Sequence, residues 1–168
     1  MEKAAVIVGL LFIGLVVNPG LRAQDKGRAE LAKAVTGAKV SLEQGVSASA
    51  STGKPISAKF EIEDGKLQLS VYTAKGDTFS EVVVDHHTGK AAKTEAITNG
   101  EDLSAAKTQN EAMAKAKQSL HVALAKTLKS NAGFRAVSIF PALKDGHAVA
   151  EITLTKGDEW KTVSEKLD

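Results

Sequence analysis

The sequence contains no cysteine and few aromatic residues. Among its 168 residues there is no Cys, which excludes a disulfide framework, a thiol nucleophile and lipid attachment through cysteine. Aromatic residues make up 4% of the chain, against 43% hydrophobic residues in all, so a core must be built mainly from aliphatic side chains and alanine. The length allows one ordinary domain or two small ones. Because a small domain buries proportionately little surface, two small domains are expected to pack against one another.

A strong charge of either sign is also missing. The chain has 22 Lys and Arg residues against 20 Asp and Glu residues, a formal net charge of +2. This balance gives no electrostatic reason to expect binding to nucleic acid or to an anionic membrane surface. The Gly-x-Ser-x-Gly and His-Glu-x-x-His motifs of hydrolases are absent, as is a phosphate-binding loop. The sequence therefore predicts a protein that is not an enzyme.

The N-terminal residues have the pattern of a secretory signal peptide. Lys3 forms a short basic region, residues 4–17 are an unbroken apolar run, and Ala23 supplies the small residue that a signal peptidase needs. The run is shorter than the roughly 20 residues that cross a bilayer, so stable membrane insertion is not expected after cleavage. We predict a signal peptide over residues 1–23, a mature chain from Gln24, and a periplasmic or secreted location. An uncleaved anchor is the alternative interpretation.

Residues 56–90 carry the strongest structural pattern. Apolar and polar residues alternate over 56–62 and over 67–71, and residues 79–84 are β-branched and aromatic. This period of two is typical of strands with one buried face. Asp64-Gly65 lies between the first two runs and predicts a tight hairpin turn. The pattern therefore predicts a three-stranded antiparallel meander.

Much of this pattern returns near the C-terminus. Asp145-Gly146 repeats Asp64-Gly65, and Lys156-Gly157-Asp158 repeats Lys75-Gly76-Asp77 with the same displacement. The sequence thus predicts an α+β fold of two repeated modules, each with a helix packed on a three-stranded antiparallel sheet. An exposed edge of such a sheet can accept an extended peptide segment through main-chain hydrogen bonds.

A helix is expected ahead of each meander. Ser41 followed by Gln44 forms a capping box at the start of the first helix. Residues 105–129 are nearly all strong helix formers, with Ser104 as a cap, so one long helix is predicted there. Pro141 lies inside the first strand of the second meander, which predicts a sheet edge or a bulge at that strand.

The predicted organisation follows from these elements. A lead-in over residues 24–38, helical or mobile and interrupted at Gly37, precedes the first module. Residues 91–102 are polar and end in Asn99-Gly100, which indicates a connection between modules. The predicted ranges are 1–23 for the signal peptide, 24–38 for the lead-in, 39–97 for module 1, 98–103 for the linker and 104–168 for module 2.

The first module resembles a PepSY domain, and the chain looks like a tandem pair of them. The resemblance covers residues 39–97 and, more loosely, 104–168. It implies a small α+β fold found in propeptides of secreted peptidases and in exported proteins, and it suggests regulation or inhibition of a peptidase, or binding of another envelope protein, without catalytic residues. The second copy lacks the Asp-x-x-Thr-Gly turn, so any role of that turn falls to Asp85, Thr88 and Gly89 alone. The matching residues are Ser41, Leu42, Gly65, Phe79, Val82, Val84, Asp85, Thr88, Gly89 and Lys90.

Two groups of metal-ligand residues leave an alternative function open. Asp85, His86 and His87 offer donors that suit zinc, copper or nickel. Alternatively, Asp85 fixes the turn through backbone amides while the histidines project in opposite directions. A hard cation such as calcium or a lanthanide would instead take carboxylates, unless these side chains only form a solvated face; they are Glu61, Glu63, Asp64, Asp77, Glu81 and Asp85. A structural protein of the cell envelope is the third interpretation.

Overall fold

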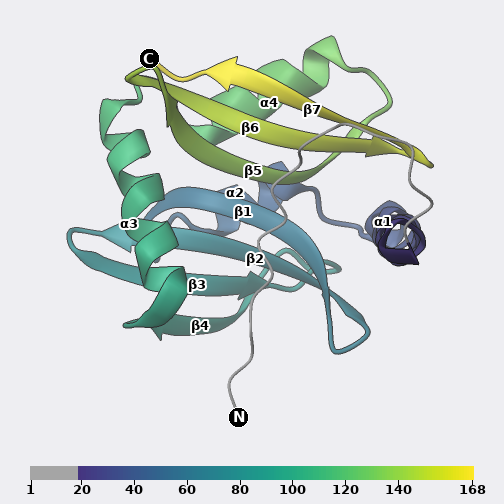
Figure 1. Ribbon diagram of the computed structural model, residues 1–168. Coiled ribbons are helices and arrows are strands. Elements are labelled where there is room, and N and C mark those ends of the chain that lie inside the picture. The colour runs from purple at the N-terminus through teal and green to yellow at the C-terminus, as the bar shows by residue number, and fades with distance from the viewer. Residues whose placement is uncertain (1–18) are drawn as a thin grey trace.

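The computed structural model describes residues 19–168, with side chains described from Lys26 onward. Within this range, four helices pack against one seven-stranded antiparallel sheet of order β4-β3-β2-β1-β5-β6-β7 (Figure 1). The predicted α+β class is confirmed. We refer to residues 19–97 as the first half and to residues 100–168 as the second half. The elements are α1 (Pro19–Gly37), α2 (Leu42–Ser49), β1 (Lys54–Glu63), β2 (Lys66–Lys75), β3 (Thr78–Val84), β4 (Ala91–Ile97), α3 (Gly100–Lys115), α4 (Leu120–Ser130), β5 (Arg135–Lys144), β6 (His147–Lys156) and β7 (Glu159–Lys166).

One Asp-Gly turn forms the first hairpin of each half. Asp64 and Gly65 have φ values of 48° and 74° between β1 and β2, and Asp145 and Gly146 have values of 52° and 82° between β5 and β6. Positive φ at both central residues suits the tight turn whose twist matches that of the flanking strands. Glycine adopts this conformation without steric cost, which explains its place in both turns.

A short ladder between β1 and β5 joins the two halves into one sheet. Only two residue pairs, Ala58 with Ile139 and Lys59 with Ser138, connect these strands. The hairpin pairs are much longer, and β1 is paired with β2 along nearly its whole length. Ala58 and Ile139 are both fully buried. The junction between the halves is therefore narrow but lies inside the hydrophobic core.

The helices α2 and α4 lie side by side and cover one face of the sheet. α2 packs mainly on β1 and β2, and α4 packs on β5, β6 and β7. At the start of α2, the Ser41 N–H donates to Gln44 Oε1 over 2.8 Å and the Gln44 N–H donates to Ser41 Oγ over 3.2 Å. This is the predicted capping box. The two helices meet where Ser47 Oγ lies 3.3 Å from His121 Nδ1.

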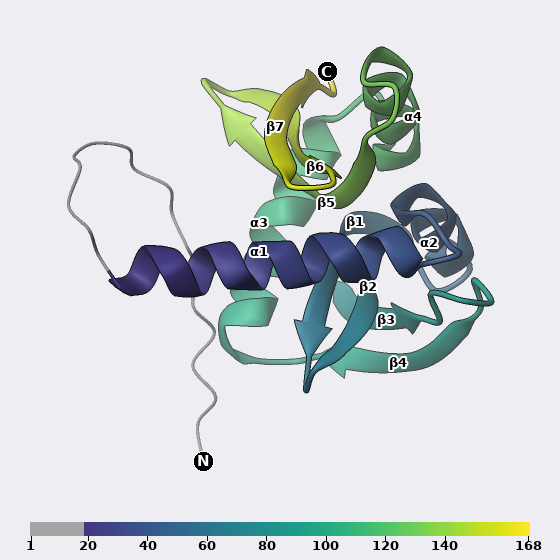
Figure 2. The same cartoon turned by 90° about the vertical axis from the view of Figure 1, so that its right-hand side faces the viewer.

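The longer helices α1 and α3 lie at opposite ends of the sheet. Figure 1 shows α1 end-on at the right of the strands and α3 at the left, and Figure 2 shows α1 crossing nearest the viewer with α3 behind it. Each helix receives a cation near its C-terminal end from the other half: Lys54 Nζ donates to the Met113 carbonyl over 3.0 Å. Arg135 likewise donates to the Ala38 carbonyl over 3.0 Å. Cations at these ends offset the partial negative charge of the helix dipole.

The predicted single helix over residues 105–129 is wrong. α3 and α4 are separate helices, and Ser119 caps the second of them through a hydrogen bond from the Val122 N–H. Between the helices, the N–H groups of Lys117 and Gln118 donate to the Leu167 carbonyl. Helix propensity is a weak preference, and here a tertiary hydrogen-bond partner overrides it.

The first half contains a fourth strand, so the predicted set of three strands for residues 39–97 is incomplete. β4 pairs with β3 inside the stretch 91–102, which was predicted to be a connection. Nearly all its residues are exposed on both faces, and without a buried face a strand shows no alternation of apolar residues. α3 begins at Gly100, so most of the predicted linker 98–103 is helical and Ser104 is no cap.

Of the two alternatives predicted for the strand that contains Pro141, a sheet edge or a bulge, the edge is wrong. β5 is an interior strand, with β1 on one side and β6 on the other. The register shift in β5 lies between Ala136 and Ser138 rather than at the proline. Pro141 is tolerated because it lies beyond the two residue pairs that join β5 to β1, so its missing N–H removes no bond from that ladder.

The N-terminal predictions fall partly outside the described residues. The signal peptide over 1–23 lies largely in residues 1–18, which the structure does not describe. α1 runs through most of the predicted lead-in 24–38 and ends at Gly37, so the lead-in is helical. In the part of the chain that the structure describes, no helix is both long enough and apolar enough to cross a bilayer.

Candidate functional site

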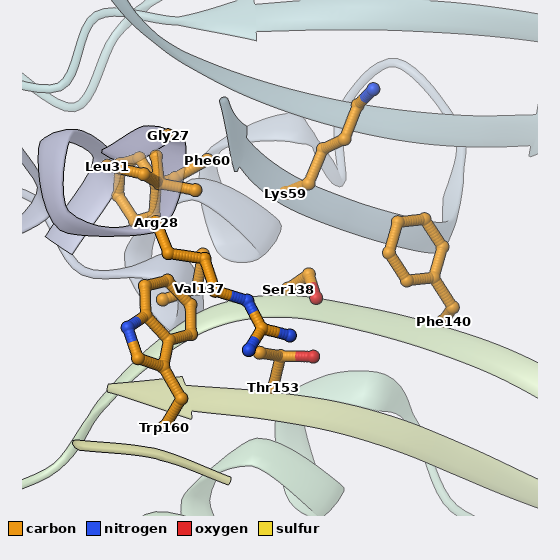
Figure 3. Close-up of a pocket in the computed structure, with 10 residues that line it drawn as sticks. All are labelled: Gly27, Arg28, Leu31, Lys59, Phe60, Val137, Ser138, Phe140, Thr153 and Trp160. Atoms are coloured by element: carbon orange, nitrogen blue, oxygen red, sulfur yellow. The ribbon is translucent and has the colours of Figure 1, made fainter. Parts of the chain in front are cut away.

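A groove of about 480 Å³ lies between α1 and the centre of the sheet. We name it the α1 groove (Figure 3). Its size falls within the range of small-ligand sites, which are concave and mostly apolar with a few placed polar groups. It takes residues from both halves, because α1 and β1 form one wall and β5, β6 and β7 form the other. The lining residues are Gly27, Arg28, Leu31, Lys59, Phe60, Val137, Ser138, Phe140, Thr153 and Trp160.

The narrow junction between the halves creates this groove. Beyond Lys59 and Ser138 the ladder between β1 and β5 has ended, so the strands separate and α1 lies over the opening. The buried side chains of Ala32 and Val35 anchor the C-terminal part of α1 in the core. Toward its N-terminal part, Gly27 has no side chain, and a Cβ there would meet nothing within 4 Å. The helix is therefore fixed at one end and leaves space beneath the other.

Arg28 is the main polar group of the α1 groove. Its Cζ lies 5.6 Å from the centre of the Trp160 ring, a distance at which a guanidinium is attracted to the face of an aromatic ring. In Figure 3 the guanidinium points toward the hydroxyl-bearing side chains of Ser138 and Thr153. Among the side chains from Lys26 onward, no carboxylate forms an ion pair with Arg28. The described groove thus holds a cation whose charge is open to an anion.

Lys59, the second cation of the groove, is already neutralised. Its Nζ lies 2.6 Å from Glu61 Oε2 and 5.8 Å from the Tyr72 ring centre. Burial lowers the pKa of Lys59, but the Glu61 hydrogen bond and the charges of Tyr72 and Glu61 outweigh burial, so the pKa is raised above 10.5. Burial raises the pKa of Tyr72 to about 12. Lys59 therefore stays protonated and paired, and among the side chains from Lys26 onward no carboxylate compensates the positive charge of Arg28.

Sequence reasoning did not identify the α1 groove. Arg28 lies in the segment predicted to be a lead-in, and Trp160 lies at the position of the second repeat that corresponds to Phe79. No spacing rule connects these two residues, because their contact depends on how α1 crosses the far half of the sheet. A single Trp in a chain poor in aromatic residues was the one available signal.

The predicted turn residues form a compact hydrogen-bonded turn after β3. Asp85 Oδ1 accepts from the N–H groups of His87 over 2.8 Å and Thr88 over 2.9 Å. Gly89 has a φ of 75°, and its N–H donates to the Asp85 carbonyl over 2.8 Å. The backbone hydrogen bonds from Thr88 and then His87 lower the pKa of Asp85. The carboxylate oxygen that the metal hypothesis would use is thus already bonded within the turn.

The two neighbouring histidines do not project in opposite directions, contrary to one of the sequence interpretations. The ring centres of His86 and His87 lie 4.1 Å apart at an interplanar angle of 40°. The reason is that β3 ends at Val84, so both residues lie in the turn rather than on a strand with alternating sides. His86 Nδ1 is buried without a hydrogen-bond partner.

The carboxylates of the hard-cation hypothesis are dispersed. Glu61 pairs with Lys59 and accepts a hydrogen bond from Ser70 Oγ over 3.1 Å, and Glu81 lies in β3 opposite Tyr72. Asp77 lies in the β2–β3 turn. In the described part of the chain, no three His, Asp or Glu side chains come together closely enough to hold an ion. Metal binding remains a prediction, which calorimetric titration can test. Five of the predicted metal-binding residues line one hollow of about 390 Å³: Glu63, Asp64, Asp85, His86 and His87.

Replacing His86 with leucine is expected to stabilise the fold by about 1 kcal/mol, because it removes a buried nitrogen that has no partner. Burial, followed by the charge of His87, lowers the pKa of His86 below 6.5. The unfolded chain therefore takes up a proton more readily, and His86 makes stability fall as the pH drops through 6.5 toward the folded-state pKa. His86→Leu should remove this contribution. Urea unfolding of both proteins at about pH 7 and about pH 5 measures how much the free energy of unfolding changes with pH. The same change in the original protein and in His86→Leu would contradict the expectation.

The arrangement of the α1 groove suits binding rather than covalent chemistry. Aromatic and aliphatic side chains form most of its surface, while Arg28, Ser138 and Thr153 supply hydrogen-bond donors near its middle. Such a lining can hold an anionic group that is attached to an apolar body. Comparisons with protein-family models, with curated proteins and with solved structures found no match.

Proposed function

We propose that the chain is an exported, non-enzymatic binding protein built from two PepSY-like modules, which acts by contact on a polypeptide partner. A secreted or periplasmic peptidase is the first candidate partner. The observation that carries the proposal is the pairing of Ala58 with Ile139 at the centre of the sheet. These residues are sequence counterparts, separated by the same displacement as Asp64 and Asp145. Counterparts meet in this way when two copies of a unit are related by a twofold axis.

Matching irregularities in the two halves support a duplicated unit. β1 has a register shift that ends at Ser57, and β5 has one that ends at Ser138, its counterpart. Lys54 and Arg135 are the first residues of the same two strands, and each donates to a carbonyl at the end of the other half's long helix. Bulges and cross-half cations are not requirements of a sheet as such, so their recurrence at corresponding positions favours duplication.

A matching backbone contact supports the same view. In the second half the Leu167 carbonyl accepts from the connection between α3 and α4. In the first half the His86 carbonyl accepts from Lys39 over 3.0 Å and from Val40 over 3.1 Å, in the connection between α1 and α2. In the proposed modules, each unit therefore consists of a long helix, a short capped helix and a meander, with β4 as an addition to the first.

Two features would let such a protein act by contact. The α1 groove lies at the junction of the halves and takes residues from both. The outer strands β4 and β7 form the two edges of the sheet in the described residues, and an open edge can accept an extended segment of a partner. β4 carries an ion pair between Lys93 and Glu95, and charged side chains on an edge discourage indiscriminate pairing.

Peptidase inhibition tests the proposed function directly. The purified chain is added to peptidases of the envelope and the culture medium of its source, and peptide hydrolysis is followed with increasing amounts of the chain. We expect saturable inhibition of at least one peptidase, with loss of inhibition after thermal unfolding of the chain. If the folded chain inhibits none of them and none forms a complex with it in size-exclusion chromatography, the peptidase proposal is wrong.

The predicted export has a simple check. The chain is expressed with its full N-terminus in a bacterial host, and intact-mass analysis is made of the periplasmic fraction and the medium. Cleavage after Ala23 should give a chain that begins at Gln24. A membrane-bound chain that retains residues 1–23 would support the uncleaved anchor instead.

A further inference from the structure

The α1 groove contains a net positive charge that no described side chain balances. Among the described residues, its lining includes two cations and no carboxylate. Lys59 is paired with Glu61, which leaves Arg28. A single guanidinium that pairs with no described carboxylate matches a singly charged, planar anion, because its parallel N–H donors fit the two oxygens of a carboxylate. The charge pattern therefore favours a carboxylate as the polar part of an occupant.

One aromatic contact orients the guanidinium of Arg28, an exposed residue. The face of the Trp160 ring lies beside it, at 5.6 Å from its Cζ. A cation that is positioned before binding loses less conformational freedom when it meets an anion. Ser138 and Thr153 line the same groove, on the side toward which the guanidinium extends in Figure 3, and each can donate an O–H to an anion. Three donors from α1, β5 and β6 thus line one groove.

The apolar side chains lie on both sides of these donors rather than in one direction from them. In Figure 3, Leu31, Phe60 and Trp160 lie on one side of the guanidinium, and Phe140 lies on the other. A fatty acid has its charge at one end and a single apolar tail, so it would use one side only. The end of a polypeptide carries a carboxylate between its last side chain and the rest of the chain, which suits donors flanked by aromatic rings.

We propose that the α1 groove binds the C-terminal end of a polypeptide whose last residue is aromatic or aliphatic. The terminal carboxylate accepts hydrogen bonds from Arg28, Ser138 and Thr153. The last side chain lies against Phe60 and Trp160, and the preceding residues leave along Phe140. This inference rests on the proposed function in that it specifies which part of a polypeptide partner is recognised.

Peptides that differ only at their C-terminus test the proposal on the full chain. The probes are a hexapeptide ending in phenylalanine with a free carboxylate, the same peptide with a C-terminal amide, and laurate. Trp160 is the only Trp and lines the groove, so its fluorescence reports occupancy, and calorimetry gives a second readout. The free peptide should bind saturably, and the amide should bind at least about tenfold more weakly, as expected for loss of a charged hydrogen bond.

Variants of two cations on α1 provide the matched comparison. Arg28→Gln should lower the affinity for the free peptide by about tenfold. It should also remove most of the difference in affinity between the free and amidated peptides, since the substitution and the amidation disrupt the same interaction. Lys33→Gln changes the charge of the same helix by the same amount at an exposed residue outside the groove, and it should alter neither affinity. Circular dichroism of both variants confirms that α1 remains folded.

Other outcomes overturn the inference or the proposed peptidase role, and they can be told apart. Equal affinity for the free and amidated peptides would show that Arg28 does not recognise a carboxylate. An unchanged preference of Arg28→Gln for the free over the amidated peptide would show the same. Binding of laurate without the peptide would assign the groove to a lipid. If no probe binds but the chain inhibits a peptidase, the terminal-carboxylate proposal fails while the proposed function stands. If the free peptide binds as expected and no peptidase is inhibited, the proposed peptidase role alone fails.

Discussion

Replacing Ile139 with alanine is expected to lower the free energy of unfolding by about 2–5 kcal/mol. Ile139 is fully buried, and its pair with Ala58 is one of the two that join β1 to β5. The smaller side chain loses apolar contacts and leaves a cavity that rigid neighbouring strands fill only in part. Urea-induced unfolding followed by circular dichroism gives the change in free energy.

Both halves should lose this stability together, because they share one sheet and one core. Amide hydrogen exchange follows β2 in the first half and β6 in the second half separately. Val122→Ala, at a side chain that is 48% exposed, is the control and should change stability by less than about 0.5 kcal/mol. Loss of protection in β6 with unchanged protection in β2 would contradict a cooperative junction.

Leu167→Ala is also expected to lower the free energy of unfolding by about 2–5 kcal/mol. The Leu167 side chain is fully buried, and its backbone N–H donates to the Ala148 carbonyl over 2.9 Å. Its carbonyl accepts from the connection between α3 and α4, so the residue ties the end of β7 to both helices. Thermal and urea unfolding measure the loss, and binding of the α1-groove peptides should weaken only near the unfolding transition.

A leucine elsewhere in the same half provides the comparison. Leu143 in β5 is 41% exposed, so Leu143→Ala removes the same atoms from a site that is already partly solvated and should cost under about 1 kcal/mol. Similar losses for Leu143→Ala and Leu167→Ala would mean that the C-terminal residues do not pack as described.

The strands could be predicted because their sequences carry the pattern of a half-buried sheet. Residues 56–62 and 67–71 alternate, and two Asp-Gly pairs mark turns that require positive φ. The capping box at Ser41 was equally predictable from the sequence, since its two hydrogen bonds join residues three positions apart. These features are local, so spacing alone determines them.

The errors occurred where distant contacts decide the structure. The break between α3 and α4 depends on the carbonyl of Leu167, which is remote in sequence. β4 lacks a buried face, so only pairing with β3 makes it a strand. Pro141 can occupy an interior strand because the β1–β5 ladder is only two residue pairs long. No local rule contains that information.

The candidate site shows the same limit. Asp85, Thr88 and Gly89 could be singled out because they lie within one turn, and their hydrogen bonds are indeed local. Arg28 and Trp160 come from the first helix and the last strand, and they meet only because the halves join at a short ladder. The two residues on which the proposed binding at the α1 groove depends most, Arg28 and Trp160, could therefore not be identified from the sequence.

The two halves meet at the ladder between β1 and β5, and an engineered disulfide tests this junction. The chain has no cysteine, so the double variant Lys59→Cys with Ser138→Cys introduces the only two thiols. Paired residues on antiparallel strands have Cα atoms about 4.5–5.5 Å apart, within the range that a disulfide needs. Gln68→Cys with Ser138→Cys is the control, because β2 and β5 are separated by β1 and their residues lie too far apart. After mild oxidation, mass spectrometry should find an intramolecular bridge in the first variant and free thiols in the control. Free thiols or bridges between molecules in the first variant would contradict the junction on which the proposed duplicated unit and the α1 groove both rest.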